Sequence, residues 1–368
     1  MIYANLWLFF AFFFTVFSCS YSEDTIVFFY TCCSLCLRIC IFCCTFAAEL
    51  NYSMTLTRTY YRVAEHLFAV ECGNAALLQC MTNYEPFRVE NGKLKSEAIF
   101  MLRIENGKLK GEEWTHVLTD NAEDMPRIEV YQASRREGNE VKGERQKARG
   151  WMFRVAMVAN APICCEMECS EDFTNGVLYI TTDCQDVRFC IDNALMLLFA
   201  FRTAPLMTLE MHAAVVVREA RGEDKGFLFL GYSGTGKSTH ARQWLAAYKD
   251  AWLLNDDNPI LRVMPNGEVR VYGSPWSGKT PCYQNAYAKV GGIVKLSQAP
   301  YNKIRRVSLP EAYAYLLSSA SGLKMERRIA DSMYESIKYV ITHVKCSHME
   351  CLPNVDAAKI CYQGIMCT

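Results

Sequence analysis

Apolar and polar positions divide the chain into an apolar leader and a longer part with alternating patterns. The first 53 residues are rich in apolar side chains, with two apolar runs over 2–21 and 25–37. From Met54 to about Asp120, short β-prone runs alternate with turns. Residues 191–204 have few polar positions and predict a buried helix. The same pattern predicts strands over 151–159, 176–182, 213–217 and 226–230.

The leader, residues 1–53, holds only four charged residues but seven of the nineteen cysteines. Its run over 2–21 is long enough for a membrane span or a signal peptide, yet no Lys or Arg precedes it. It is rich in Phe, Cys, Tyr, Ser and Leu, whose codons can all begin with T. A T-rich untranslated leader would give such a composition if it were read as protein. Three interpretations stay open: a spurious extension before a true start at Met54, a membrane anchor, and a cleaved signal. In an anchored protein, Arg58 and Arg62 favour a cytoplasmic body.

Two nearly identical octets, 90–97 and 105–112, each carry an Asn-Gly pair between β-prone residues. Since both residue types tolerate positive φ, the octets predict two turns of one antiparallel meander. Two copies are too few for a solenoid. Residues 135–150 are charged and contain Gly, which predicts an exposed loop.

Charge and cysteine usage narrow the class of protein. Lys plus Arg equals Asp plus Glu at 39 each, so no basic excess points to nucleic acid as a partner. A chain of 368 residues, 51% hydrophobic, can bury a core without disulfides and suggests about two domains. The twelve cysteines after residue 53 are irregularly spaced, which favours a reducing cytoplasm over a disulfide framework.

One cysteine cluster could suggest a metal site. Cys346, His348 and Cys351 lie within six residues, beside a strand-like run over 339–344. The cluster lacks a second ligand pair at zinc spacing, so we expect a structural role for it.

A phosphate-binding loop follows the predicted strand over 226–230. Its residues are Gly231, Tyr232, Ser233, Gly234, Thr235, Gly236, Lys237 and Ser238, and a helical run begins at Thr239. The pattern G-x-x-x-x-G-K-S between a strand and a helix predicts that backbone amides and the helix N-terminus hold phosphates. Lys237 would then bridge the β- and γ-phosphates of ATP, and the Ser238 hydroxyl would ligate Mg²⁺.

Two adjacent carboxylates follow nineteen residues after Lys237. Asp256 and Asp257 follow an apolar run over 251–254, with Asn255 between the run and the pair. Such a pair can divide the labour, one holding the metal and the other taking a proton from an acceptor hydroxyl. Like charges this close also raise the pKa of one carboxyl group, which suits a base near neutral pH.

These motifs together resemble a known family. A strand preceded by His212, the loop from Gly231 to Ser238, and an Asp pair about twenty residues later are similar to the catalytic core of HPr kinase/phosphorylase. That core is related to the nucleotide-binding core of ATP-dependent phosphoenolpyruvate carboxykinase. Residues 271–281 further resemble uncharacterised HPr-kinase-like proteins of bacterial genomes. The resemblance covers about 206–361 and implies an α/β fold, with an HPr-kinase-type P-loop domain over 206–368 behind a strand-rich α+β domain over 54–205.

The resemblance also implies roles for individual residues. His212, Lys237 and Asp256 would be catalytic, with Asp256 as the proton acceptor, and Arg306 would act near the phosphates. Besides the loop residues, Thr239 would lie at the nucleotide, and Ser238 would hold Mg²⁺. For Asp257, the pairing of the two carboxylates predicts a share in the metal site.

The family's Glu-Ile-Arg-Gly-Leu-Gly signature is missing, and residues 273–279 stand near its place. Kinase chemistry survives this departure better than phosphorylase activity or recognition of HPr. Lys279 could contact a phosphate or an acidic acceptor, or could simply be solvated. The basic group Lys303, Arg305 and Arg306 could form an anion-binding lip or a solvated charge run. His240 is expected at the surface or behind the site rather than as a catalyst.

The sequence therefore predicts a cytoplasmic, Mg²⁺-dependent ATP kinase acting on a serine or another hydroxyl of an unidentified protein or small molecule. A membrane partner is expected only if the leader is real, and a homo-oligomer stays open. Two alternatives also stay open. One is an ATP-binding regulatory module with little turnover, and the other is a carboxykinase-like or small-molecule kinase activity.

Overall fold

The computed structural model describes residues 56–90, 96–107, 114–120, 126–133, 150–181, 184–220, 222–278 and 280–367. These residues belong to one compact unit, Leu56–Thr368. Two mixed β-sheets with helices make up the described part, which confirms the mixed α/β class. The leader and the loop over 135–149 lie outside the described residues.

The first sheet has the strand order β3-β1-β2-β4-β9-β8-β7-β6-β5. Its strands are β1 (Thr57–Val63), β2 (His66–Cys72), β3 (Arg88–Val89), β4 (Met101–Asn106), β5 (Trp114–Asp120), β6 (Arg127–Ala133), β7 (Gly150–Ala156), β8 (Ile163–Ser170) and β9 (Asn175–Ile180). Between β2 and β3 run the short helices α3 (Ala75–Leu78) and η1 (Gln79–Phe87).

Helix α4 (Val187–Thr203) confirms the buried helix expected after the first sheet. It begins where the Asp186 side chain accepts a hydrogen bond from the backbone N–H of Phe189, at 2.9 Å. Buried residues recur at helical spacing, including Ile191, Leu195 and Leu198. The helix lies so close to β9 that a Cβ on Gly176 would come within 2.8 Å of the Leu198 side chain.

Within the described residues, the segment Val187–Leu206, which is α4 with the short helix η3 (Ala204–Leu206), is the one helix long and apolar enough to cross a membrane. In the structure, 56% of it is buried inside the protein. Its apolar positions are therefore used for core packing.

The second sheet has the order β10-β14-β15-β16-β12-β11-β13, with β18 pairing both β16 and β17. Its strands are β10 (Thr208–Glu210), β11 (Ala213–Ala220), β12 (Glu223–Leu230), β13 (Trp252–Asp257), β14 (Ile260–Val263), β15 (Val269–Tyr272), β16 (Tyr287–Gln298), β17 (Lys303–Arg306) and β18 (Cys346–Cys351). Its helices are α5 (Lys237–Ala247), α6 (Leu309–Ser319), α7 (Arg327–His343) and α8 (Val355–Cys367).

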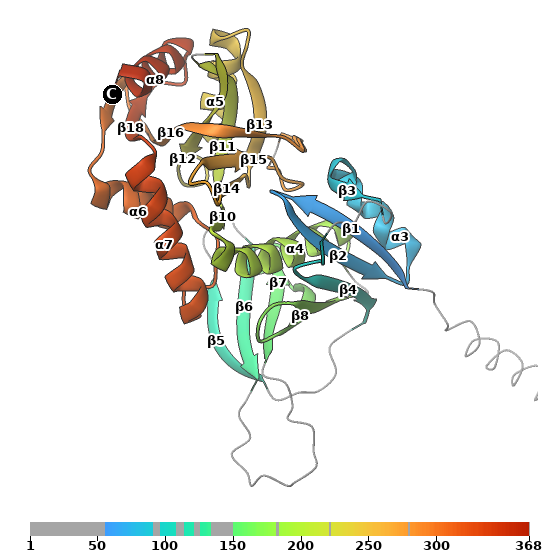
Figure 1. Cartoon of the computed structure of the whole chain (residues 1–368). Coiled ribbons are helices and arrows are strands. Elements are labelled where there is room, and N and C mark those ends of the chain that lie inside the picture. Colours follow the sequence, from blue (N-terminus) through green and yellow to red (C-terminus); the bar gives the residue numbers. More distant parts are fainter. Residues whose placement is uncertain are drawn as a thin grey trace, which may run out of the picture. The chain divides into compact units, whose positions relative to one another are not determined.

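Helices α5 and α8 lie next to each other and cover one face of the second sheet (Figure 1). Their apolar side chains, among them Trp244 and Cys361, pack with Phe227, Phe229 and Val294 of the strands. The alternate residues of the same strands, such as Leu228 and Leu230, belong to the larger core that includes α4, α6 and α7. The second sheet is therefore buried on both faces.

Two local predictions are wrong. The octets do not flank one meander, because β4 pairs in parallel with β2 and β9 and is not adjacent to β5. The buried Leu102 and Ile104 give β4 a place between distant strands, and this packing outweighs the turn signal at 106–107. Residues 91–95 of the first octet lie outside the described residues. The run over 339–344 is the end of α7, whose buried Ile337 and Val340 follow helical spacing.

Two buried histidines predict a pH-dependent stability. Burial lowers the pKa of His66 to about 3 and that of His240 to about 4. Because the unfolded chain then binds more protons below pH 6.5, each imidazole should cost about 2 kcal/mol of unfolding free energy between pH 7 and pH 5. Urea denaturation at both pH values should show this loss reduced in His66→Gln, while His343→Gln at the exposed end of α7 should leave it unchanged. An equal loss in wild type and His66→Gln would contradict the prediction.

Candidate functional site

The phosphate loop, His212 and the Asp pair meet at one edge of the second sheet because of strand register. Strand β11 is antiparallel to both β12 and β13, with Ala213 opposite Leu230 on one side and opposite Asp257 on the other. The chain enters β11 where β12 and β13 end. His212, Gly231 and Asp257 are therefore brought together from positions up to 45 residues apart.

The glycines of the loop from Gly231 to Ser238 permit its backbone conformation. Gly234 and Gly236 have φ of +78° and +103°, a region that side chains disfavour. A Cβ on Gly231 would come within 2.9 Å of the Thr235 side chain. Gly236 is the N-cap of α5, and no acidic residue lies in the first turn of that helix. The N-terminus of α5 therefore offers free N–H groups and a positive dipole to an anion.

Lys237 lies buried at the start of α5, with only 8% of its surface exposed. Its Nζ donates to the backbone oxygens of Gly231 at 3.0 Å and Tyr232 at 3.2 Å. Burial lowers its pKa, and the negative charges of Asp257 and Asp256 partly oppose that effect. The loop thus holds an ammonium group at its own centre, where a bound phosphate would compete for it.

His212 and Asp257 complete a three-residue cluster with Lys237. The His212 Nε2 lies 3.0 Å from Lys237 Nζ and 3.3 Å from Asp257 Oδ1. A ring with its proton on Nδ1 accepts from Lys237, and a ring with a proton on Nε2 donates to Asp257. The side chains of His212 and Asp257 are 27% and 35% exposed, so a substrate can reach both.

Asp256 lies differently from its neighbour. It is 4% exposed, and its Oδ1 has no hydrogen-bond partner within the described part of the chain. Asp256 pairs with Ala214, whose side chain packs in the cluster below α5, whereas Asp257 pairs with Ala213 on the opposite face. The contacts therefore put Asp257 next to His212, whereas the register puts Asp256 on the sheet face that α5 covers.

The remaining predicted site residues are placed less closely. Thr239 is half-buried in the first turn of α5. Arg306 is exposed at the end of β17, and no hydrogen bond or ion pair joins it to Lys237, His212 or Asp257 in the described chain. Lys279 lies outside the described residues, although Gly278 N–H donates to the Asp256 carbonyl at 3.0 Å. Of the suggested basic lip, Arg305 is engaged by Glu311 at 2.7 Å.

A cavity of about 540 Å³ opens beside the phosphate loop. Its lining comes from the loop and α5, the end of β16, and the segment after β18: Gly234, Thr235, Gly236, Thr239, His240, Leu296, Gln298, Ala299, Cys351, Leu352 and Pro353. His240 is buried rather than at the surface, and its Nε2 accepts a hydrogen bond from Trp244 Nε1 at 3.1 Å. The lining thus combines the glycines and threonines of the loop and α5 with apolar residues such as Leu296, Ala299 and Leu352, a mixture common in small-molecule sites.

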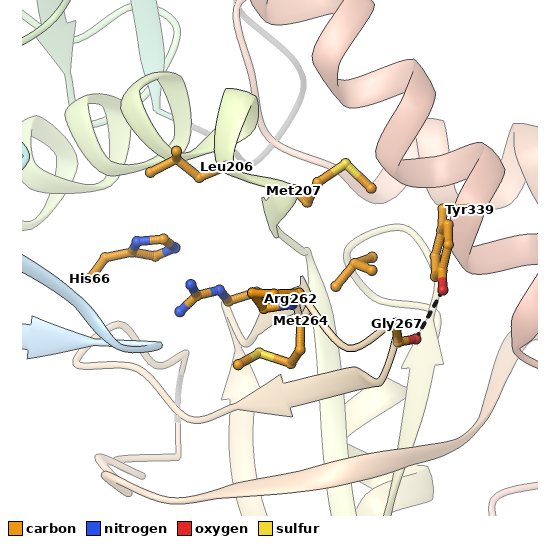
Figure 2. Close-up of a pocket in the computed structure, with 9 residues that line it drawn as sticks. His66, Leu206, Met207, Arg262, Met264, Gly267 and Tyr339 are labelled. Carbon is orange, nitrogen blue, oxygen red and sulfur yellow. Dashed lines mark hydrogen bonds between the residues drawn. The ribbon is translucent and has the colours of Figure 1, made fainter.

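A second cavity, of about 530 Å³, shares no residue with the first (Figure 2). His66, Met207, Arg262 and Tyr339 are among its lining residues, and the Tyr339 hydroxyl donates to the Gly267 carbonyl at 3.1 Å. The Arg262 guanidinium is already bound to the backbone oxygen of Ala64 and pairs with Glu65. This cavity lacks the glycine-rich loop and helix N-terminus that a phosphate site needs.

No group of three or more His, Cys, Asp or Glu side chains in the described residues could hold a metal ion. Mg²⁺ commonly takes only one or two protein oxygens and completes its shell with phosphate oxygens and water, so a site for it does not need such a group. The unpartnered Asp256 Oδ1 and the Ser238 hydroxyl are oxygens of that kind.

Sequence reasoning missed several residues of this site. Asn255 is fully buried, and its side chain fixes the turn that carries the Asp pair. Glu210 is 1% exposed, and neither of its carboxyl oxygens has a partner in the described structure. Burial and, secondarily, the charge of Asp257 raise the pKa of Glu210 well above its ordinary value. In the sequence, each was signalled by a polar residue next to a motif. Asn255 lies directly before the Asp pair, and Glu210 lies two residues before His212.

Lys295 is a further missed residue. It lies opposite Leu230 in the register of β16 with β12. Its Nζ is 4.4 Å from the centre of the Tyr232 ring, and burial lowers its pKa. This amine faces the loop as a second cation.

Neither a comparison with models of known protein families nor a comparison with curated protein sequences finds a match to this chain.

Proposed function

We propose that this chain is an HPr-kinase-like phosphotransferase that transfers the γ-phosphoryl group of ATP to a hydroxyl group of a protein or small molecule. The observation that carries the proposal is the cluster of Lys237, His212 and Asp257 at the first turn of α5. A phosphate loop alone would support binding only. A carboxylate and an imidazole beside the loop lysine add the groups that proton transfer needs.

In this proposal the loop amides and the α5 N-terminus bind the phosphates, and Lys237 moves from the Gly231 and Tyr232 carbonyls to the γ-phosphate. The acceptor oxygen forms a bond to the γ-phosphorus, the bond to the β–γ bridging oxygen breaks, and ADP leaves with that electron pair. The hydroxyl proton passes to the Asp257 carboxylate, which His212 orients. Mg²⁺, when bound through Ser238 and Asp256, supplies charge neutralisation on the phosphates.

The cavity beside the loop supports a nucleotide rather than a bare phosphate. Its apolar end, formed by Leu296, Ala299 and Leu352, is suited to a base, and Thr239 and Gln298 offer hydrogen-bonding groups. The Gln298 amide already donates to the Gly234 carbonyl at 3.2 Å. The cysteines of the described part are all free, which supports a cytoplasmic location.

A substitution in the cavity tests directly whether the nucleoside of ATP binds there. Ala299→Trp should place an indole in the cavity and weaken MgATP binding at least tenfold, because the base loses its space. Inorganic tripolyphosphate needs only the loop, so its affinity should stay within about twofold. Calorimetry with both ligands measures the difference, and Ala246→Trp on the exposed side of α5 is the control. Equal ATP affinity in Ala299→Trp and wild type would place the nucleoside elsewhere.

Phosphoryl transfer itself is tested by incubating the full chain and γ-labelled ATP with a bacterial extract, followed by mass spectrometry of labelled species. A labelled acceptor that depends on the added protein is the expected result. ATP binding without any labelled acceptor or ADP formation would favour the alternative of a regulatory ATP-binding module.

A further inference from the structure

A hydrogen-bond network begins in the N-terminal half of the chain, at Asp192 of α4. Its Oδ1 accepts from the Tyr84 hydroxyl at 2.7 Å and from Asn83 Nδ2 at 3.0 Å. Its Oδ2 accepts from Arg188 Nε at 3.3 Å. Asn83 and Tyr84 are both fully buried, so their hydrogen bonds have no water to replace them.

The network crosses to the segment between β15 and β16. Trp276, 2% exposed, donates through Nε1 to the Tyr84 hydroxyl at 2.8 Å. Asn83 Nδ2 also donates to the Pro275 carbonyl at 2.9 Å. Tyr84 and Trp276 thus meet although they lie 192 positions apart. The segment that carries Trp276 has no regular secondary structure. The N-terminal half thus supplies one hydrogen bond to Pro275 and one to the Trp276 indole. Ser274 and Asn255 hold the Trp276 backbone from the other side.

The same segment continues the network to the Asp pair. Asn255 Nδ2 donates to the Trp276 carbonyl at 2.9 Å. Asn255 Oδ1 accepts from the backbone N–H groups of Asp257 at 3.0 Å and Asn258 at 2.8 Å. A Cβ on Gly278 would come within 2.8 Å of the Asp256 carbonyl oxygen, so the segment lies directly against the pair. A continuous path therefore joins Asp192 to the backbone of Asp257.

We propose that Tyr84, with Asp192, Trp276 and Asn255, is a positioning residue that holds Asp257 against His212, so that the N-terminal half of the chain completes the catalytic site. Buried hydrogen bonds of this kind act as a unit, since each member orients the next. Within the described chain Tyr84 makes no hydrogen bond to Asp257 or to the phosphate loop, so its effect is indirect. The catalytic part of this inference rests on the proposed kinase function.

The test uses the full chain with Tyr84→Phe, which removes one hydroxyl and keeps the ring. Hydrogen exchange of backbone amides over 252–258 should become about tenfold faster, because Trp276, whose carbonyl accepts from Asn255, is no longer held through its indole N–H. Single-turnover transfer or ATP hydrolysis should fall about 10- to 100-fold, as expected when a reacting group shifts by a fraction of an ångström. Affinity for MgATP should stay within about twofold, since the loop is unchanged.

Phe199→Leu is the matched control. Phe199 packs against the same Trp276 ring at 5.3 Å but takes no part in the hydrogen bonds. It should lower the melting temperature at least as much as Tyr84→Phe without changing exchange over 252–258 or turnover. Should Tyr84→Phe fail to fold, Asp192→Asn, which keeps the shape of the acceptor, should produce the same pattern at reduced size.

Equal exchange and equal turnover in Tyr84→Phe and Phe199→Leu would overturn the positioning role and leave Tyr84 as a packing residue. The two proposals fail separately. A wild-type chain that turns over no ATP rejects the kinase function, whereas unchanged exchange over 252–258 in Tyr84→Phe rejects the network, whatever the activity.

Discussion

Replacing Lys237 by alanine should lower ATP-dependent phosphoryl transfer by about 10²- to 10³-fold, as with other preorganised donors to transition-state charge. Lys237 Nζ is held by two loop carbonyls and lies 3.0 Å from His212 Nε2. A water molecule at the centre of the loop could not replace Lys237, because it carries no positive charge. Transfer from labelled ATP under single-turnover conditions measures the loss.

The control for this substitution is Lys249→Ala, which removes an exposed lysine in the turn after α5. It should leave transfer unchanged within about twofold. Binding of MgATP to Lys237→Ala should be weakened less than transfer, because the loop amides and the helix N-terminus remain. Wild-type transfer by Lys237→Ala would show that the loop does not bind the reacting phosphate.

The two carboxylates should respond differently to neutral replacement. Asp257→Asn should lower transfer by about two to four orders of magnitude with MgATP affinity nearly intact, the usual range for a lost acid or base. Asp256→Asn should instead raise the Mg²⁺ concentration needed for half-maximal activity, since the buried Asp256 Oδ1 has no other partner in the described structure. This division is the opposite of the one expected from sequence, where the resemblance made Asp256 the proton acceptor and the pairing of the carboxylates gave Asp257 a share in the metal site.

Binding isotherms and single-turnover transfer for both variants over a Mg²⁺ series separate the two assignments. Loss of transfer at saturating Mg²⁺ in Asp256→Asn, with Asp257→Asn active, would restore the assignment predicted from sequence. Unchanged turnover in both variants, with effects on affinity alone, would favour an ATP-binding module over a kinase.

Local elements of this fold could be predicted from sequence because their signals are local. The apolar runs before Gly231 and before Asp256 form β12 and β13, and the helix after Lys237 begins at a glycine N-cap. Strand order could not be predicted in this way. Strand β4 lies between β2 and β9 because of pairings 32 and more residues away, and the Asn-Gly signal beside it carries no information about them.

The candidate site, too, could be predicted only where its signals are local. The loop and the Asp pair follow from spacing, but the contact of Asp257 with His212 depends on both lying at the ends of antiparallel strands. Asn255 and Trp276 gain their roles only from side-chain hydrogen bonds across the fold. Arg306, whose role the resemblance implies, makes no hydrogen bond or ion pair with Lys237, His212 or Asp257 in the described chain. A single sequence identifies chemical groups more readily than the partners that orient them.

The wall of the cavity beside the phosphate loop is completed late in synthesis. Leu352 and Pro353 come after β18, and β18 pairs in parallel with β16, more than 50 residues earlier. A nascent chain on the ribosome therefore carries the phosphate loop for over a hundred residues before the cavity can close. Parallel pairing at this separation is slow to form, and the exposed edge of β16 invites association with other chains meanwhile. If the proposed function holds, ATP can occupy the complete cavity, and so stabilise the fold through it, only after β18 has left the ribosome.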